Sequence, residues 1–212
     1  MHGALSAHIG AAYAAQTSFT VDLLLDPNIS INGAGYYQAT IDGTTYAVYC
    51  NEMTASKGPE GTYRISDASQ GTHRQDYIIA RGYPNTTSIA GSSWSGTDAL
   101  QITQIASWMD SVSSLSYDDV VAQTKKFGGV GVPRELYDAA VALFAAADAY
   151  DGGDASIDGA AMTAVSDEHS QGAQRILLAN LHPTGSIEIA KSSSNESVTN
   201  GNACFFIASF YP

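Results

Sequence analysis

Charged side chains are scarce in this 212-residue sequence, and basic ones are the scarcest. Lys and Arg together number 9, against 21 Asp and Glu, so the formal net charge is −12. A surface of this sign repels phosphate groups, which excludes nucleic acids and anionic membrane surfaces as expected partners. The charged fraction of only 14% favours an extracellular bacterial module over a cytosolic enzyme.

Long hydrophobic runs are also missing. The longest apolar stretch, 139–147, falls short of the roughly 18 residues that a membrane-spanning helix needs. The chain does not open with a basic segment followed by an apolar one, so we expect that any secretion signal has been removed. We therefore expect a protein that does not insert into the membrane, and these features leave its localisation open.

Alternating or β-branched apolar residues predict strands in both the first and the last part of the chain. Asp42-Gly43 suits the tight turn of a hairpin and lies between two of these segments. The segment 174–181 fits a strand or a helix by length and pattern, and we interpret it as a strand. The predicted strands are 18–25, 36–41, 44–50, 62–65, 77–80, 174–181, 187–190 and 204–211.

The middle of the chain has a helical period instead. Asp98, with Gln101 three residues later, predicts an N-cap and a helix over 99–110. Ser116 caps a second helix that Gly128 ends, and apolar positions repeat along one face of a third. This third helix is expected over 133–150.

These elements predict an α+β fold, in which N- and C-terminal strands form a β-sandwich or barrel and carry a helical insertion in the middle. We expect a single domain over 1–212. Its β portion covers about 16–95 and 174–212, and its helical insertion covers about 97–165.

Two cysteines in an extracellular chain predict a Cys50–Cys204 disulfide by default. However, Cys50 ends an aromatic-rich strand, and the helix expected after Asp98 carries Gln101 and Gln104 among apolar residues. Helix geometry alone places Gln101 further inward, although a capping role is open to it. The plain interpretation of Gln104, flanked by apolar residues one turn away, is a glutamine at the edge of the core that is hydrogen-bonded to a neighbouring strand. From the residues alone, neither the disulfide nor a joint role of Cys50 with one of the two glutamines is excluded.

Three motifs together resemble the thioester domains of Gram-positive surface adhesins. The first is Tyr49-Cys50 at a strand end, within YCNEMTASKGP. The second is Gly82-Tyr83-Pro84, within YIIARGYP, and the third is TQIASW over 103–108. The resemblance runs from the predicted hairpin to the third helix, over half the chain, and the third motif is its most specific part.

The resemblance implies an internal thioester between the Cys50 sulfur and the Gln104 side-chain carbonyl. A thiolate is a strong nucleophile, and fixed geometry can make even an amide reactive toward it. A lysine amine of a host extracellular or cell-surface protein would then displace the sulfur, in a single covalent turnover and not in enzyme catalysis. Apolar shielding by Tyr49, Tyr83 and Trp108, together with Leu100, is expected to exclude water.

The resemblance further implies a secreted protein attached to the bacterial cell wall. The chain would be a monomeric domain within a larger multidomain adhesin, without cofactor or metal. Two departures from the family pattern stand out: Ser107 replaces a bulky apolar residue, and Cys204 is an additional cysteine whose apolar neighbours indicate a buried thiol.

Two other function classes remain open. A disulfide-stapled β-sandwich would bind a glycan or a protein reversibly through exposed tyrosines. A hydrolase or transferase would pair Cys50 with one of three histidines, His73, His169 or His182. The acidic residues Asp148, Asp151, Asp154 and Asp158 lack the spacing of an EF-hand and are expected to form a solvated loop.

Overall fold

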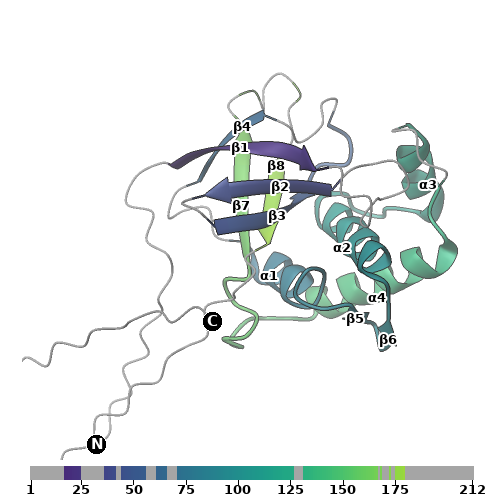
Figure 1. Cartoon of the computed structure of the whole chain (residues 1–212). Coiled ribbons are helices and arrows are strands. Elements are labelled where there is room, and N and C mark those ends of the chain that lie inside the picture. Colours follow the sequence, from purple (N-terminus) through teal and green to yellow (C-terminus); the bar gives the residue numbers. More distant parts are fainter. Residues whose placement is uncertain are drawn as a thin grey trace, which may run out of the picture. The chain divides into compact units, whose positions relative to one another are not determined.

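A computed structural model shows how the predicted elements are arranged (Figure 1). It describes residues 17–24, 36–41, 44–55, 61–65, 71–126, 131–166, 168, 172 and 175–179. The strands predicted over 187–190 and 204–211, and Cys204 itself, lie outside the described residues.

Six strands close into an antiparallel barrel in the order β1-β2-β3-β8-β7-β4. The predicted hairpin is confirmed, because Ile41 pairs with Thr44 across the β2–β3 turn. The strand prediction for 174–181 is also confirmed. The six strands are β1 (Thr17–Leu24), β2 (Tyr36–Ile41), β3 (Thr44–Cys50), β4 (Gly61–Ile65), β7 (Ala161–Ser166) and β8 (Arg175–Ala179).

Alternation along the strands sorts their side chains into two layers. Val48, Tyr63 and Leu178 are among the buried residues of one apolar cluster. Their neighbours in sequence, such as Tyr49 and Leu177, belong instead to a second cluster with residues of two helices. β3 and β8 are therefore buried on both faces, which explains their nearly continuous apolar sequence.

Four helices are described: α1 (His73–Ala80), α2 (Gly96–Ser111), α3 (Tyr117–Lys126) and α4 (Arg134–Asp148). A two-residue hairpin, β5 (Ser88–Ile89) and β6 (Ser92–Ser93), separates α1 from α2. In Figure 1, α1 and α2 lie beside the β3 end of the barrel, and α4 runs past both of them. None of the described helices is long and apolar enough to span a membrane.

The helix starts show which sequence signals were interpreted correctly. Ser116 and Asp119 do form a reciprocal cap, because each backbone N–H donates to the other side chain. The predicted cap of α2 was wrong: Ser95 is its N-cap and accepts the backbone N–H of Asp98 at 3.1 Å. Asp98 therefore lies inside the helix, at its third position.

The strand predicted over 77–80 is also wrong, because these residues form the second half of α1. Thr72 and Gln75 make a capping box in which each side chain bonds the backbone N–H of the other. A short apolar run fits both the period of a strand and the period of a helix. The capping signal before this run favours a helix.

The helical insertion ends earlier than its predicted end near residue 165. The last described helix, α4, stops at Asp148, and 161–166 is strand β7 in the wall of the barrel. β7 has few strongly apolar residues of its own. Its strand conformation follows from its pairing with β8 and β4.

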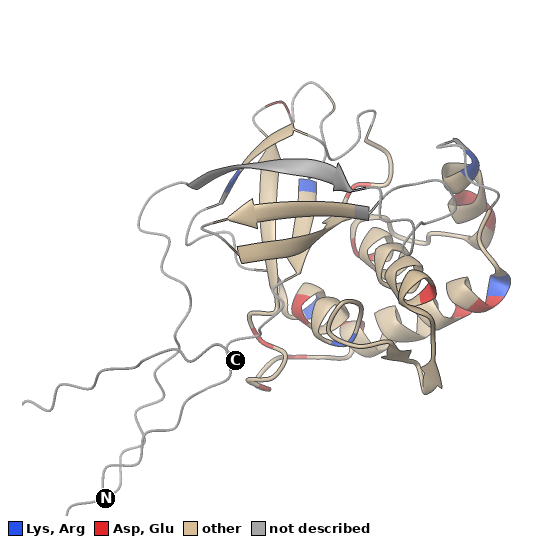
Figure 2. Ribbon diagram, viewed as in Figure 1, with Lys and Arg blue, Asp and Glu red and all other residues tan. Residues whose placement is uncertain are grey.

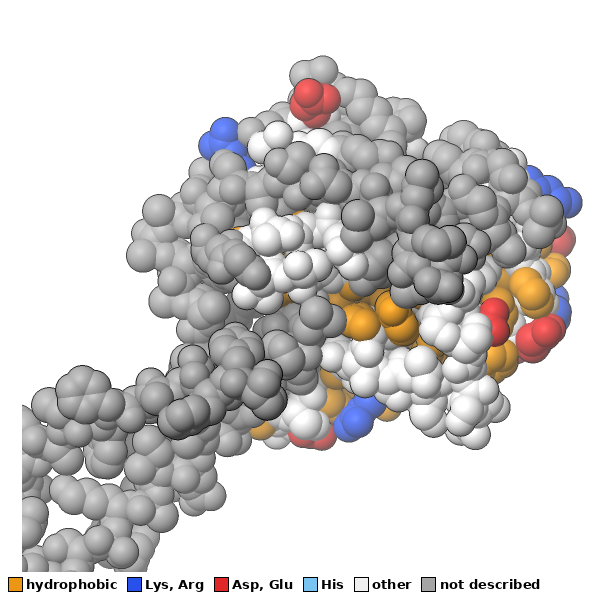
Figure 3. All heavy atoms as spheres, viewed as in Figure 1, with side chains coloured by type: hydrophobic (Ala, Val, Ile, Leu, Met, Phe, Trp, Pro, Cys, Tyr) orange, Lys and Arg blue, Asp and Glu red, His pale blue; other side chains and the backbone are white. Residues whose placement is uncertain are grey.

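Hydrophobic side chains are mostly covered. One face of the molecule shows them mainly over the helical part (Figure 3). Within the described part of the chain, the large hydrophobic residues that are clearly exposed are Val141 and Val165. Acidic residues outnumber basic ones along the helices and their connecting loops (Figure 2), as the sequence predicts.

Asp76 joins α1 to β7 through a buried carboxylate. Only 5% of the residue is exposed, and its Oδ1 accepts the Ala161 backbone N–H at 2.9 Å. Desolvation by burial raises the pKa of this carboxyl above its ordinary value of 3.8, although backbone hydrogen bonds from Ala161 and Gly159 oppose the shift.

A raised carboxyl pKa means that the folded state holds the proton more tightly than the unfolded state. Asp76 should therefore lower the free energy of unfolding as pH rises above 3.8 and through the raised folded-state pKa. The Asp76→Asn variant keeps an acceptor for Ala161 without the charge, so it should gain stability relative to the wild type over this rise. Urea denaturation at a series of pH values measures the difference, and a pH-independent difference would contradict the assignment.

Candidate functional site

Cys50 lies at the end of β3, at the boundary between the barrel and the helices. It pairs with Ile176 of β8, which fixes its main chain in the barrel wall. The residue is half-buried and packs against the apolar core of the helical part. The strand end predicted for this cysteine is thus confirmed.

Gln104 lies in the middle of α2 and holds the main chain of Cys50 with both ends of its amide. Its Oε1 accepts the Cys50 backbone N–H at 3.0 Å, and its Nε2 donates to the Cys50 carbonyl oxygen at 2.7 Å. The two residues are 54 positions apart in sequence. Because both bonds go to the residue that bears the sulfur, the amide carbon is held beside Cys50.

Gln101 is buried one turn earlier, with 4% of the residue exposed against 8% for Gln104. Its expected capping role is wrong, because α2 begins at Gly96 and its cap is Ser95. Helix periodicity correctly placed Gln101 further inward. The hydrogen bonds to the Cys50 main chain come from Gln104, the glutamine that the resemblance selects.

The Gly82-Tyr83-Pro84 motif connects the other two. The Tyr83 backbone N–H donates to Thr103 Oγ1 at 2.8 Å, and the Tyr49 hydroxyl donates to the Tyr83 carbonyl oxygen. Gly82 packs so closely on α2 that a Cβ atom there would lie 2.5 Å from Thr103 Oγ1. Three motifs distant in sequence therefore meet at one place.

The expected shielding residues belong to two apolar clusters of the core. Tyr49 and Leu100 are buried in the layer between the barrel and the helices, with Tyr83 packed against it. Trp108 is buried in the helical core, and its Nε1 has no hydrogen-bond partner in the described part of the chain. Ser107, the departure from the family pattern, is fully buried and donates to the Thr103 carbonyl oxygen at 2.9 Å.

Asn51, which the sequence did not single out, has a similarly unsatisfied side chain. Only 2% of the residue is exposed, and its Oδ1 has no hydrogen-bond partner among the described residues. Its backbone N–H donates to the Arg175 carbonyl oxygen at 3.0 Å. A buried acceptor without a donor is costly, so Asn51 is a candidate for contact with a ligand.

Of the three histidines in the Cys–His hypothesis, only His73 lies among the described residues. His73 begins α1, where its Nδ1 lies 3.5 Å from Asp158 Oδ1 and its ring meets Tyr150 edge-on. His169 and His182 are outside the described residues. The contacts of His73 thus give the Cys–His hypothesis no support.

Several acidic residues after α4 bond locally. Asp154 Oδ1 accepts the Ser156 N–H and hydroxyl, and Asp158 Oδ2 accepts the Gly153 N–H. One grouping suits a cation by distance: ligand atoms of His73, Asp76 and Asp158 lie within 4.8 Å of one another. The sequence interpretation missed this set because it assigned the segment after Asp76 to a strand.

Comparison with solved structures places the fold. The pilus-presented adhesin Spy0125 (Cpa) superimposes with a TM-score of 0.50 at 14% identity, over 85% of this chain and 73% of that chain. This chain has the fold of that adhesin. The expected resemblance and the α+β class are thereby confirmed at the level of fold, with a barrel as the β portion.

Two further structures align less closely. The N-terminal domain of the Streptococcus pyogenes pilus tip adhesin Cpa gives a TM-score of 0.46 at 13% identity, covering 84% of this chain and 98% of that chain. The N-terminal thioester domain of the fibronectin-binding protein SfbI from Streptococcus pyogenes gives 0.44 at 10% identity, covering 85% and 98%. No protein-family model and no curated protein matches the sequence.

The close approach of Gly82 to α2 generates a stability prediction. In Gly82→Ala, the new Cβ would lie 2.5 Å from both the Ile78 carbonyl oxygen and Thr103 Oγ1. Relief of these contacts should cost about 1–3 kcal/mol of unfolding free energy, as overpacking does elsewhere. A lower midpoint of urea denaturation would show this loss.

Gly96→Ala is the matched control for this substitution. Its Cβ would meet the Tyr83 ring at an ordinary 3.6 Å, and alanine restricts the unfolded chain more than glycine does. The Gly96 variant should keep or slightly raise the midpoint. Equal loss in both variants would mean that the contact between Gly82 and α2 has no special role.

Proposed function

We propose that this chain is a domain of a bacterial surface adhesin in which Cys50 and Gln104 form an internal thioester. The observation that supports this most directly is the pair of hydrogen bonds from the Gln104 amide to the Cys50 main chain. Likeness of fold to a pilus-presented adhesin supports the adhesin part of the proposal.

Thioester formation would begin with attack of the Cys50 thiolate on the side-chain carbonyl carbon of Gln104. A C–S bond forms, the C–N bond breaks, and the nitrogen leaves as ammonia after gaining the thiol proton. Negative charge develops on Oε1, the oxygen that the Cys50 N–H already contacts at 3.0 Å. A donor fixed at this position stabilises that charge, and the fixed geometry replaces a collision.

The thioester would then react with a lysine amine of a host extracellular or cell-surface protein. The uncharged amine nitrogen attacks the acyl carbon, a C–N bond forms, the C–S bond breaks, and the thiolate takes up a proton. Burial of Tyr49 and Trp108, with Tyr83 packed beside them, supports their proposed role in keeping water from the acyl group.

In this proposal the chain is a single-use reagent and not an enzyme, because its acyl group stays bonded to the target. A covalent link removes dissociation as the limit on attachment under flow. We place the protein on the outer surface of a Gram-positive cell, attached to the cell wall as one monomeric domain of a longer adhesin that acts in virulence.

The intact mass of freshly purified, unreacted protein tests the proposal. It should be one ammonia below the mass calculated from the sequence, and methylamine should then add its full mass. A mass two hydrogens low would indicate the Cys50–Cys204 disulfide of the reversible-binding hypothesis. A mass equal to the calculated one, without an adduct, would exclude a thioester.

Single variants assign the atoms involved. Cys50→Ala and Gln104→Ala should each restore the calculated mass and abolish the methylamine adduct. Gln101→Ala, which changes a glutamine one turn away on the same helix, should retain the adduct. Cys204→Ala should retain it as well if that thiol is a bystander. Loss of the adduct in Gln101→Ala alone would reassign the acyl donor.

A further inference from the structure

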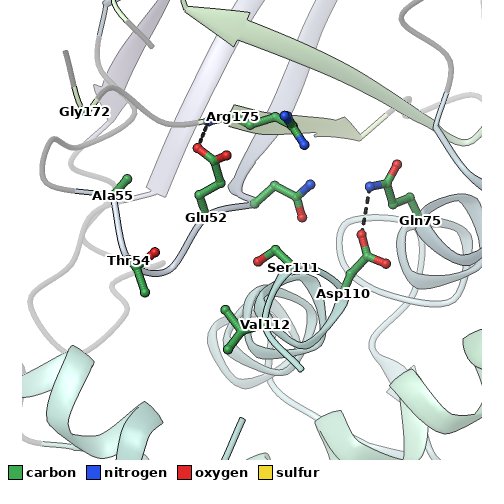
Figure 4. A pocket seen from close by; sticks show the side chains of 10 residues that line it. Glu52, Thr54, Ala55, Gln75, Asp110, Ser111, Val112, Gly172 and Arg175 are labelled. Atoms are coloured by element: carbon green, nitrogen blue, oxygen red, sulfur yellow. Dashed lines mark hydrogen bonds between the residues drawn. The ribbon is translucent and has the colours of Figure 1, made fainter. Parts of the chain in front are cut away.

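A polar pocket of about 560 Å³ begins at the residue that follows Cys50. Its walls come from the loop after β3, the start of β8 and the last turn of α2 (Figure 4). The lining residues that matter here are Asn51, Glu52, Thr54, Asp110, Ser111 and Arg175.

The pocket extends along α2 from the proposed thioester. Consecutive Cα atoms are about 3.8 Å apart, so the main chain of Asn51 in the pocket wall adjoins that of Cys50. Ser111 follows Gln104 by seven residues, which is two helical turns on the same face and about 10 Å along the axis. The pocket therefore lies along the face of α2 that carries Gln104.

Oxygen acceptors dominate the pocket. Asn51 Oδ1 is buried without a hydrogen-bond partner in the described chain, and carboxylates line the pocket at Glu52 and Asp110. Arg175 contributes the one basic side chain among the described lining residues. Both carboxylates already accept hydrogen bonds, Asp110 from Arg74 at 3.3 Å and from Gln75 at 2.8 Å, and Glu52 from the Arg175 backbone N–H. The pocket acceptor without a partner among the described residues is Asn51 Oδ1.

The loop after β3, which carries Asn51 and Glu52, is held in position by β8 of the barrel and by α3. Glu52 Oε2 accepts the Arg175 backbone N–H at 2.8 Å, a bond visible in Figure 4. The Asn51 N–H donates to the Arg175 carbonyl oxygen, and Gln123 of α3 donates to the carbonyl oxygen of Met53. A ligand therefore meets acceptors whose positions are fixed before binding, which lowers the entropy lost on binding.

We propose that this pocket binds the ammonium group of the target lysine, with Asn51 Oδ1 and the Glu52 carboxylate as its acceptors. The inference rests on the proposed thioester and adds the recognition step before attack. A protonated primary amine offers three donors, and the chain's net charge of −12 attracts cations generally. The bound ammonium releases a proton to the buffer before its nitrogen attacks the acyl carbon.

The experiment compares two nucleophiles with the same intact protein. N-acetyl-lysine methylamide carries the ammonium, whereas hydroxylamine is largely uncharged near neutral pH and attacks the same carbon. Glu52→Gln keeps an oxygen for the Arg175 N–H but removes the charge. It should slow adduct formation with the lysine derivative about tenfold, the loss expected for one hydrogen bond to a charged group, and leave hydroxylamine unchanged.

Glu135→Gln, which removes the same charge from an exposed position on α4, is the matched control. It should leave the rate of adduct formation unchanged for both nucleophiles. Equal slowing of both nucleophiles in Glu52→Gln, or of neither, would overturn the pocket's role while the thioester stands. If unreacted wild-type protein forms no adduct with hydroxylamine, the proposed thioester fails, and the recognition step fails with it.

Wild-type protein provides a second measurement that does not depend on the folding of any variant. Added sodium chloride should slow the lysine derivative more than hydroxylamine, because salt screens the attraction between the ammonium and the carboxylate. The same slowing for both nucleophiles would count against ammonium binding. In Glu135→Gln, salt should again slow the lysine derivative more than hydroxylamine, whereas in Glu52→Gln it should slow both equally. This pair of results would support ammonium binding.

Discussion

The candidate site depends on one contact between the barrel and the helices, the amide of Gln104 on the main chain of Cys50. A side-chain amide that both donates to and accepts from a single residue is fixed in position and in orientation. The contact requires α2 to lie close against the end of β3. Thr103 secures that approach by accepting the Tyr83 N–H, and Gly82 permits it because it has no side chain.

The last two residues of β3 differ in burial. Tyr49 is almost wholly enclosed, yet Cys50, the next residue, is only half-buried and adjoins the Asn51 end of a polar pocket. For the proposed thioester, the apolar side chains on one side would exclude bulk water, and the polar pocket on the other side would admit the nucleophile. The barrel supplies the rigidity, since the main chain of Cys50 and Asn51 and the side chain of Glu52 are bonded to Ile176 and Arg175 of β8.

The strands before residue 70 were predictable because their alternation and the Asp42-Gly43 turn signal agree. α1 was predictable in principle from the Thr72 and Gln75 cap, but the apolar run after it suggested a strand. β7 was not predictable from local pattern, because its conformation follows from pairing with distant strands. Periodicity could not choose Gln104 over Gln101; only the motif resemblance did. The pocket joins residues from separate segments, so its unsatisfied Asn51 had no signature in the sequence.

The reaction proposed for this chain also determines where mechanical load enters it. After an amine displaces the sulfur, the target is bonded to the Gln104 side chain, and the bond between Gln104 and Cys50 is broken. Tension therefore acts on the middle of α2 and not on a barrel strand. That helix is packed against Leu136, Ala140 and Leu143 of α4, so the helical core would resist the pull while the hydrogen bonds of the barrel remain largely unloaded.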